Sequence, residues 1–234
     1  MFSLRGKRVG RFSVMSGSRS LDNFPVVRRR PVVAIIGSAP IGRDLSETID
    51  SCDIVIRINE CKVYGGNSGN RTDILCVTNT GAPAHRFIKH KSIAGGGFYP
   101  QVSEVWFPRD SAVHKAKALE WDPFFPLSEM DDLWREIAET NSLWTKKLFH
   151  FSGFFNISLF NTLICRSRKP FLCPSTGIFT ISHVLTDSRF SDFDKYAAGF
   201  RYKGWPFHPW DVERELMLEY AGKREDFFLA VETG

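Results

Sequence analysis

Short, strongly apolar segments alternate along the chain with segments whose apolar residues recur every three or four positions. Segments of the first kind, such as PVVAIIG, are typical of strands buried on both faces, and the second kind is typical of helices. We expect strands at residues 31–37, 53–59, 71–80, 103–110 and 195–200. We expect helices at about 112–120, 129–141, 154–166, 176–187 and 209–222, and a short helix between the first two strands. This alternation predicts an α/β fold with a mainly parallel sheet.

The pattern predicts one three-layer, Rossmann-like domain over residues 32–234, preceded by a basic arm at 1–31. The arm has eight Arg or Lys residues and one acid, so it carries +7, whereas the net charge of the chain is +5. We expect the arm to be disordered. Contact with anionic lipid at an inner membrane is the second expectation, since each basic residue near such a surface contributes about 1 kcal/mol. Because the positive charge is confined to the arm, the sequence argues against nucleic-acid binding.

The remaining composition is that of a globular protein, with 43% hydrophobic and 24% charged residues. No apolar run approaches the roughly 18 residues of a membrane-spanning helix, and the N-terminus lacks the apolar region of a signal peptide. The five cysteines are odd in number and include no Cys-x-x-Cys pair, which argues against a disulfide framework or a zinc site. We therefore expect a cytoplasmic protein, which is peripheral at the inner membrane if the arm binds lipid.

The ends of the expected strands carry small or hydrogen-bonding residues, and ligands of parallel sheets bind beyond the carboxyl ends of the strands. These ends are Gly37-Ser38-Ala39, Arg57-Ile58-Asn59, Thr78-Asn79-Thr80 and Gly199-Phe200. They suit a nucleotide that lies across the edge of the sheet. The segment GSAPIG at 37–42 is neither a dinucleotide fingerprint nor a phosphate loop, which weakens a generic nucleotide-enzyme interpretation.

Arg57 and Asn59 project to the same face of their strand and both need polar partners, because an unpaired buried polar group costs about 1–3 kcal/mol. Two interpretations stay open. Arg57 forms an internal salt bridge while Asn59 caps a turn, or Asn59 binds a ribose or base while Arg57 supports the site.

The segment Pro174-Ser175-Thr176-Gly177 stands at the start of an expected helix. It is either a turn with an N-cap or a cradle of backbone N–H groups for an anion. His208 directly precedes Pro209, which suits the first position of the last helix. A helix N-terminus disfavours the imidazolium, so His208 is expected to be a neutral imidazole that can act as a general base. The alternative is that His208 only caps this helix beside Trp205.

Asp192 and Asp194 form an Asp-x-Asp pair of the kind that holds a divalent metal in many glycosyltransferases. Here the pair precedes its strand, which puts both acids at the wrong edge of the sheet. We therefore expect a solvated turn there and assign no metal site.

Three ordered motifs resemble the sialyltransferases, glycosyltransferase family 29, and in particular their short bacterial members. The segment AIIGSAPIGRDLSETIDSCDIVIRIN at 34–59 is similar to the large motif of the family. Pro174 to Gly177, followed by Gly199-Phe200, is similar to the small motif, and His208 with Glu213 is similar to the very small motif. Two departures are visible: Ser38 replaces the usual Asn, and a further aromatic/His motif is not recognisable between residues 177 and 208.

The resemblance implies a sialyltransferase-like variant of the GT-A fold and metal-independent, inverting transfer from a CMP-activated sugar. The sugar would be sialic acid, Kdo or a similar ulosonic acid, and the acceptor a glycan or glycolipid in polysaccharide biosynthesis. His208, with Glu213, would take the proton of the acceptor hydroxyl. Donor-binding residues would be Gly37, Ser38, Asn59, Pro174, Ser175, Thr176, Gly177 and Gly199, supported by Arg57 and Trp205. No cofactor is implied, because the CMP-sugar is a substrate.

A second hypothesis is a non-catalytic nucleotide-sugar-binding or accessory protein that retains this fold. The loss of the usual Asn at position 38 and of the aromatic/His motif favours it, whereas the retention of His208 and Glu213 favours the enzyme.

Overall fold

Seven strands form a parallel sheet at the centre of the computed structural model, which describes residues 30–93 and 96–230. The strands are β1 (Val32–Ile36), β2 (Ile54–Ile58), β3 (Ile74–Cys76), β4 (Glu104–Phe107), β5 (Lys147–His150), β6 (Asp194–Ala198) and β7 (Phe227–Leu229). Their order is β5-β4-β3-β2-β1-β6-β7, and every neighbouring pair runs parallel. The chain builds one half of the sheet outward from β1 and then crosses back to place β6 on the other side of β1. Such a reversal leaves a crevice at the carboxyl ends of the two strands.

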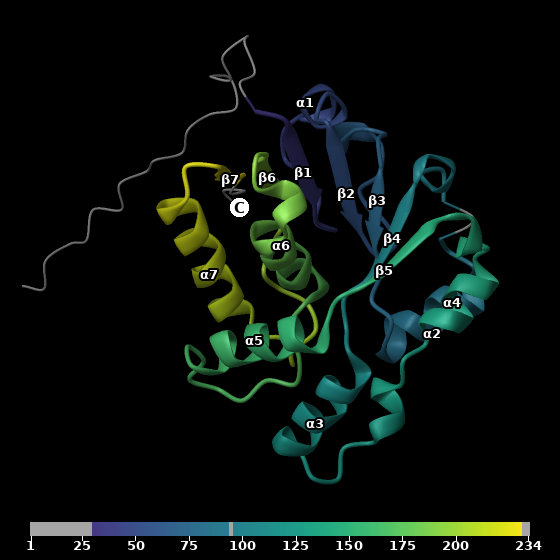
Figure 1. The fold of residues 1–234 in the computed structure, drawn as a ribbon, viewed down its shortest axis with the longest axis vertical. Helices are drawn as coiled ribbons and strands as arrows, with labels where there is room; N and C mark the ends of the chain where they lie inside the picture. The colour runs from purple at the N-terminus through teal and green to yellow at the C-terminus, as the bar shows by residue number, and fades with distance from the viewer. Residues whose placement is uncertain (1–29, 94–95, 231–234) are drawn as a thin grey trace, which may run out of the picture.

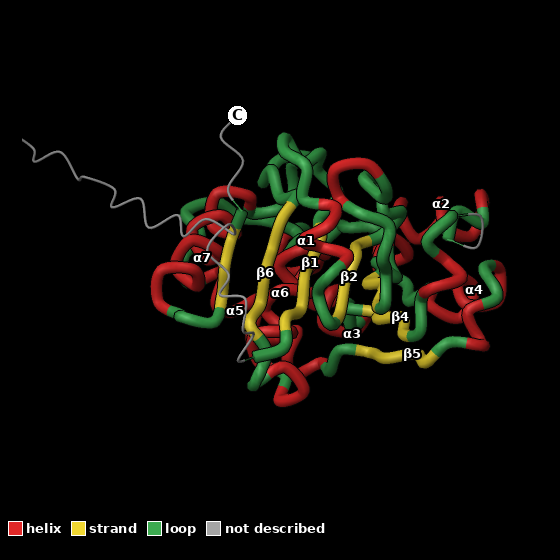
Figure 2. Tube along the Cα trace, turned by 90° about the horizontal axis from the view of Figure 1, so that it is seen from above, coloured by secondary structure: helices red, strands yellow, loops and turns green. Residues whose placement is uncertain are grey.

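Helices cover both faces of the sheet and complete three layers (Figures 1 and 2). One face packs against α5 (Gly153–Ile164), α6 (Thr176–Thr186) and α7 (Trp210–Lys223). The other face packs against α1 (Ser46–Asp50), α2 (Gly81–His90) and α4 (Trp134–Thr140). The α3 helix (Ser111–Trp121) lies beside α5. Short 3-10 turns complete the set: η2 (Gly66–Ser68), η3 (Tyr99–Gln101), η4 (Leu127–Met130), η5 (Leu143–Thr145) and η6 (Ser188–Phe190).

The first strand shows why the sheet is buried on both faces. Val33 and Ile35 belong to the core under α5–α7, whereas Ala34 and Ile36 belong to the core under α1. All five side chains of β1 are buried, as the continuous apolar run predicts.

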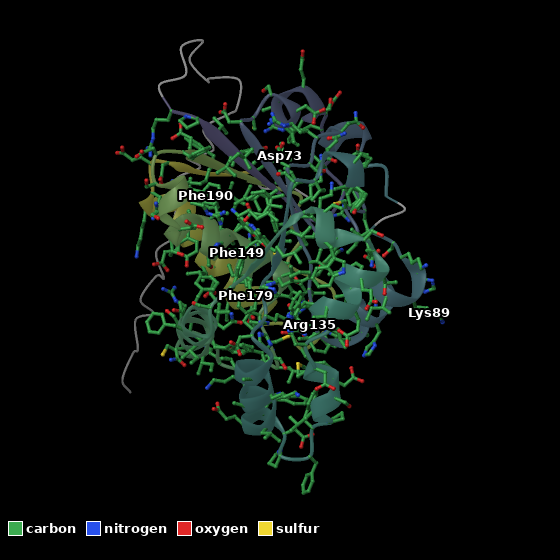
Figure 3. The ribbon with its side chains drawn as sticks, turned by 45° about the vertical axis from the view of Figure 1, so that its right-hand side comes forward. Asp73, Lys89, Arg135, Phe149, Phe179 and Phe190 are labelled. Atoms are coloured by element: carbon green, nitrogen blue, oxygen red, sulfur yellow. The ribbon has the colours of Figure 1, made fainter. Side chains whose placement is uncertain are left out.

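Aromatic side chains fill much of the larger core. In Figure 3, Phe149, Phe179 and Phe190 lie in the middle of the molecule, whereas Lys89 projects from its surface. Ring contacts link Trp106 to Phe149 and Phe190, each with a centroid separation of 6.1 Å. This packing fixes the positions of β4, β5 and η6 relative to one another.

The single α/β domain and its parallel sheet are confirmed, and so are the five predicted strands and the helices α3, α5, α6 and α7. Three elements were missed. The strand β5 is four residues long and has no buried side chain, so it lacks the apolar run that marks β1. The strand β7 is apolar but only three residues long, and it directly follows the last helix. The α2 helix buries only Ala84 and Phe87, which is too narrow an apolar stripe to stand out in the sequence.

One predicted helix is shorter than expected. The helix predicted at 129–141 begins only at Trp134, because the chain first forms η4 and then a turn in which Asp132 accepts a hydrogen bond from the Trp134 N–H. The basic arm predicted for residues 1–31 lies outside the described residues except for Arg30 and Pro31. Within the described part of the chain, no helix combines the length and apolar character needed to cross a bilayer.

Candidate active site

A cavity of about 360 Å³ opens at the carboxyl edge of the sheet, next to the crevice between β1 and β6. Three groups of residues surround it: the ends of the strands, the start of α6, and the segment that leads from β6 into α7. The lining of the cavity includes Gly37, Ser38, Asn59, Thr78, Arg109, Ser175, Thr176, Gly177, Gly199, Phe200, His208 and Glu213.

Two glycines allow the ends of β1 and β6 to come together at the cavity. The Gly37 N–H donates to the Ala198 carbonyl at 2.8 Å, and the Ala39 N–H donates to the Gly199 carbonyl at 3.0 Å. A Cβ atom on Gly37 would lie 2.2 Å from the Gly199 carbonyl oxygen, and Gly199 itself has φ +76°. Side chains are therefore excluded here, and the backbone itself forms the cavity wall beside the exposed Ser38.

Asn59 and Arg57 have different roles, although both come from β2 and its end. Asn59 adopts φ 56°, and its Oδ1 accepts a hydrogen bond from the Thr78 N–H at 2.9 Å. Its amide nitrogen is the side-chain group left to donate to a ligand in the cavity. Arg57 is buried and donates to the Ser68 hydroxyl and to the carbonyls of Ser68, Gly69 and Arg71. It therefore holds the loop behind the site and does not border the cavity.

The start of α6 is both a cap and a cradle. The Ser175 Oγ caps the helix by accepting from the Ile178 N–H at 3.3 Å. The next two N–H groups, those of Thr176 and Gly177, have no acceptor among residues 30–93 and 96–230, and both residues border the cavity. An α-helix leaves its first N–H groups unpaired and is positive at this end, so an anion is favoured there. Pro174 is buried behind this turn and does not border the cavity.

Glu213, on the first turn of α7, holds the start of α6 in place. Its Oε1 accepts from the Ser175 N–H at 2.7 Å, and its Oε2 accepts from the Ser175 hydroxyl at 2.6 Å. Only 1% of the residue is exposed, and this burial raises the pKa of the carboxyl to about 7, against the lowering effect of the two hydrogen bonds. The sequence placed Glu213 beside His208, whereas these bonds assign its carboxylate to Ser175.

His208 borders the cavity and is held to the protein through one ring nitrogen. Its Nδ1 lies 2.7 Å from the Cys173 carbonyl, which can only accept, so Nδ1 carries the proton. The Nε2 atom has no partner in the described part of the chain, and it is the acceptor in this tautomer. Trp205 and Trp210 pack edge-on against the ring at centroid separations of 5.0 and 4.8 Å, although Trp205 does not itself border the cavity.

The environment of His208 keeps it neutral. Burial and, to a smaller extent, the charge of Arg109 lower its pKa to about 4, while the bond to Cys173 acts in the opposite direction. The neutral state agrees with the expectation from the sequence, but burial is its main cause.

The sequence analysis missed Arg109, a buried arginine that borders the cavity immediately after β4. Its Nη1 donates to the Thr80 hydroxyl at 2.9 Å, and its Nε has no hydrogen-bond partner among the described residues. A signal for it exists in the sequence, since a charged residue follows a strand at the edge where ligands bind. The strand was predicted to continue to residue 110, so Arg109 was assigned to the strand and not to its end.

Asp192 and Asp194 lie at the amino end of β6, as expected, away from the cavity. Asp194 pairs with Arg30 at 3.6 Å. Across the described residues, no three His, Cys, Asp or Glu side chains form a group that could hold a metal ion.

Comparison with solved structures shows that the fold is that of the sialyltransferases. The crystal structure of a mammalian sialyltransferase matches 86% of this chain and 69% of its own, with a TM-score of 0.52 at 16% sequence identity. A mammalian sialyltransferase in complex with Gal-beta-1-3GalNAc-ortho-nitrophenol has the same coverage, a TM-score of 0.53 and 15% identity. At this level of identity the likeness defines the fold alone.

The sequence is similar to a protein with a different description. It is 29% identical over 200 residues to the urease operon 23 kDa accessory protein of Rhizobium meliloti (strain 1021), which covers 82% of this chain and 89% of that protein. No family model matches the sequence. The chain thus combines a sialyltransferase-like fold with a sequence relative described as an accessory protein.

Proposed function

We propose that the protein is an inverting glycosyltransferase that moves a ulosonic or nonulosonic acid, such as sialic acid or Kdo, from a CMP-sugar to a hydroxyl group of a glycan or glycolipid. The observation that carries the proposal is the state of His208. Its imidazole is neutral, its Nδ1 is held by Cys173, its Nε2 has no partner among the described residues, and His208 borders the same cavity as Thr176 and Gly177 with their unpaired N–H groups. A base and an anion cradle that share one cavity fit the transfer of an anionic sugar better than nucleotide binding alone.

In the proposed reaction, Nε2 of His208 accepts the proton of the acceptor hydroxyl while the hydroxyl oxygen forms a bond to the anomeric carbon of the donor. The bond between that carbon and the phosphate oxygen breaks on the opposite face, and CMP leaves with the bonding electrons. The N–H groups of Thr176 and Gly177 stabilise an anionic group of the donor. Asn59 and Ser38, at the ends of β2 and β1, hold the cytidine. The donor is a substrate, and the proposal includes no resident cofactor or metal.

The acceptor and the cellular site belong to the same proposal. A glycan or glycolipid acceptor, a cytoplasmic location and contact of the basic arm with the inner membrane are expectations from the sequence. Vesicle binding by the full chain, with and without anionic lipid, tests the last of them.

A second candidate is a non-catalytic nucleotide-sugar-binding or accessory protein with the same fold. The similarity of this chain to a urease operon accessory protein favours this candidate. Such a protein would bind CMP or a CMP-sugar without releasing CMP from the sugar.

The test measures CMP release from CMP-sialic acid and CMP-Kdo in the presence of glycan acceptors. The variant His208→Ala should lower turnover by about 100-fold or more, since a positioned general base contributes roughly 10²–10⁴-fold. Its affinity for CMP should stay within about twofold of wild type, because removal of a base leaves the contacts to the nucleotide in place. The matched control is His90→Ala, a change at an exposed histidine on α2. Unchanged turnover in His208→Ala would refute the base assignment, and CMP-sugar binding without turnover in the wild type would favour the accessory protein.

A further inference from the structure

Arg109 is a buried cation without a carboxylate partner. Its exposed fraction is 8%, and it forms no ion pair with any acid among residues 30–93 and 96–230. Its one side-chain hydrogen bond uses Nη1, which leaves the edge formed by Nε and Nη2 without an acceptor from the described residues. Arg57, which is also buried, instead has four acceptors. Since a buried charge is costly unless it is paired, the free edge of Arg109 points to an anionic ligand.

Two buried asparagines fix the backbone that carries this guanidinium. The Asn79 side chain accepts from the Arg109 N–H at 3.1 Å and donates to the Arg109 carbonyl at 2.9 Å. The Asn156 side chain accepts from the Asp110 N–H at 3.2 Å and donates to the Pro108 carbonyl at 3.1 Å. Both asparagines are 0% exposed. A three-residue segment held at each end in this way is preorganised for binding, because it loses little freedom when the ligand arrives.

Arg109 and His208 border the same cavity. Arg109 follows β4, which is two strands away from β2 and three strands away from β1, or about 10 and 14 Å at the usual strand spacing. Ser38 and Asn59, the residues proposed for the cytidine, follow β1 and β2. The charge of Arg109 contributes to lowering the pKa of His208 and that of Glu213, in agreement with the place of all three residues on one cavity.

We propose that Arg109 binds the carboxylate of the donor sugar and so selects CMP-ulosonic acids over CMP and over nucleotides of uncharged sugars, an assignment that rests on the proposed function. In a 2-ulosonic acid the carboxylate is attached to the anomeric carbon. The base that deprotonates the attacking hydroxyl and the cation that binds the carboxylate must therefore share one cavity, as His208 and Arg109 do. The free Nε and Nη2 edge presents two parallel donors, which match the two oxygens of a carboxylate.

The test removes each partner of this interaction in turn and measures binding by calorimetry. The ligands are cytidine, CMP, CMP-sialic acid or CMP-Kdo (whichever binds more tightly), and the methyl ester of that CMP-sugar, which lacks the carboxylate charge. The protein variants are Arg109→Gln, Arg109→Lys, and the control Arg135→Gln, which changes an exposed arginine on α4 (Figure 3).

Wild type should bind the acid about 10- to 100-fold more tightly than the ester, as expected for a pair of charge-assisted hydrogen bonds. Arg109→Gln should bind acid and ester equally, with CMP affinity within about threefold of wild type. Arg135→Gln should behave as wild type. Arg109→Lys keeps the charge and loses the paired donors, so it should retain only part of the preference. This variant also tests the assignment if Arg109→Gln does not fold, since an unchanged preference in Arg109→Lys would overturn it.

Three results would contradict the assignment in different ways. Persistence of the acid-over-ester preference in Arg109→Gln would show that another group binds the carboxylate. Equal losses for CMP and the CMP-sugar, with cytidine unaffected, would assign Arg109 to the phosphate. A wild-type protein that binds neither CMP nor the CMP-sugar would refute the proposed function itself, and the assignment of Arg109 with it.

Discussion

The buried carboxyl of Glu213 should make the stability of the protein depend on pH, and Glu213→Gln should remove that dependence. Burial raises its pKa from 4.5 to about 7, so the folded protein holds this proton more tightly than the unfolded chain does. The stability contributed by the protonated form is fully present below pH 4.5 and is lost as the pH rises through 7. With about 1.4 kcal/mol for each pH unit, the free energy of unfolding should fall by about 3 kcal/mol over this range.

Glutamine keeps the shape of the side chain and cannot ionise. Its carbonyl can accept from the Ser175 N–H, and its NH₂ group can donate to the Ser175 oxygen. His208 contributes an opposite pH dependence, because its pKa is lowered to about 4, so its contribution is lost as the pH falls towards 4. The difference between wild type and Glu213→Gln cancels this contribution, since Glu213 is not among the causes of the His208 shift.

The assay is urea unfolding of wild type, Glu213→Gln and the control Glu215→Gln at several pH values from 4.5 to 8. Glu215 is an exposed residue on the same helix, so its variant should parallel wild type. Glu213→Gln should gain about 3 kcal/mol relative to wild type between pH 4.5 and 7. A difference between these two proteins that stays constant across the series would refute the assignment of a raised pKa to Glu213.

Three further predictions concern the walls of the cavity and the base. Gly37→Ala places a Cβ atom 2.2 Å from the Gly199 carbonyl oxygen, so the free energy of unfolding, measured by thermal unfolding, should fall by about 1–3 kcal/mol or more. A change near zero would show that the two strand ends can separate. Asn79→Ala leaves the N–H and carbonyl of Arg109 without their partners, so it should lower the free energy of unfolding by about 2–4 kcal/mol. It should also weaken CMP-sugar binding more than CMP binding. An equal effect on both ligands would contradict the role of Asn79 in holding Arg109. The acid limb of kcat/KM for CMP-sugar turnover should have its midpoint near pH 4. In Arg109→Gln this midpoint should move to higher pH, because loss of the Arg109 charge raises the pKa of His208. A midpoint near pH 6.5 in both proteins would contradict the lowered pKa.

The central strands of the sheet could be predicted from the sequence, because the apolar patterns that mark them lie within a few consecutive residues. β1 is a continuous apolar run that ends at Gly37, and β2 is interrupted only by Arg57 before Asn59; such segments have few alternatives to a doubly covered strand. β5 could not be predicted, because a short strand at the edge of the sheet needs no apolar run, and the apolar segment of β7 is only three residues long. Their existence depends on backbone pairing with β4 and β6, which are distant in sequence.

The site was predictable to the extent that it consists of strand ends and helix starts. The cap at Ser175 follows from its place at a helix start, whereas the neutral state of His208, although expected, results mainly from burial. The role of Glu213 could not be predicted, because its contact with Ser175 joins residues 38 positions apart. The role of Arg109 could not be predicted either, because it depends on which of its donors remain unpaired. That follows only from its tertiary contacts with Thr80 and Asn79.

The central claim is that the cavity at the ends of β1, β2 and β6 binds a cytidine nucleotide. Calorimetric titration of the full chain with CMP, UDP, GDP and NAD tests it most directly. The site predicts a clear preference for CMP. An absence of CMP binding, or tighter binding of one of the other three nucleotides, would contradict it.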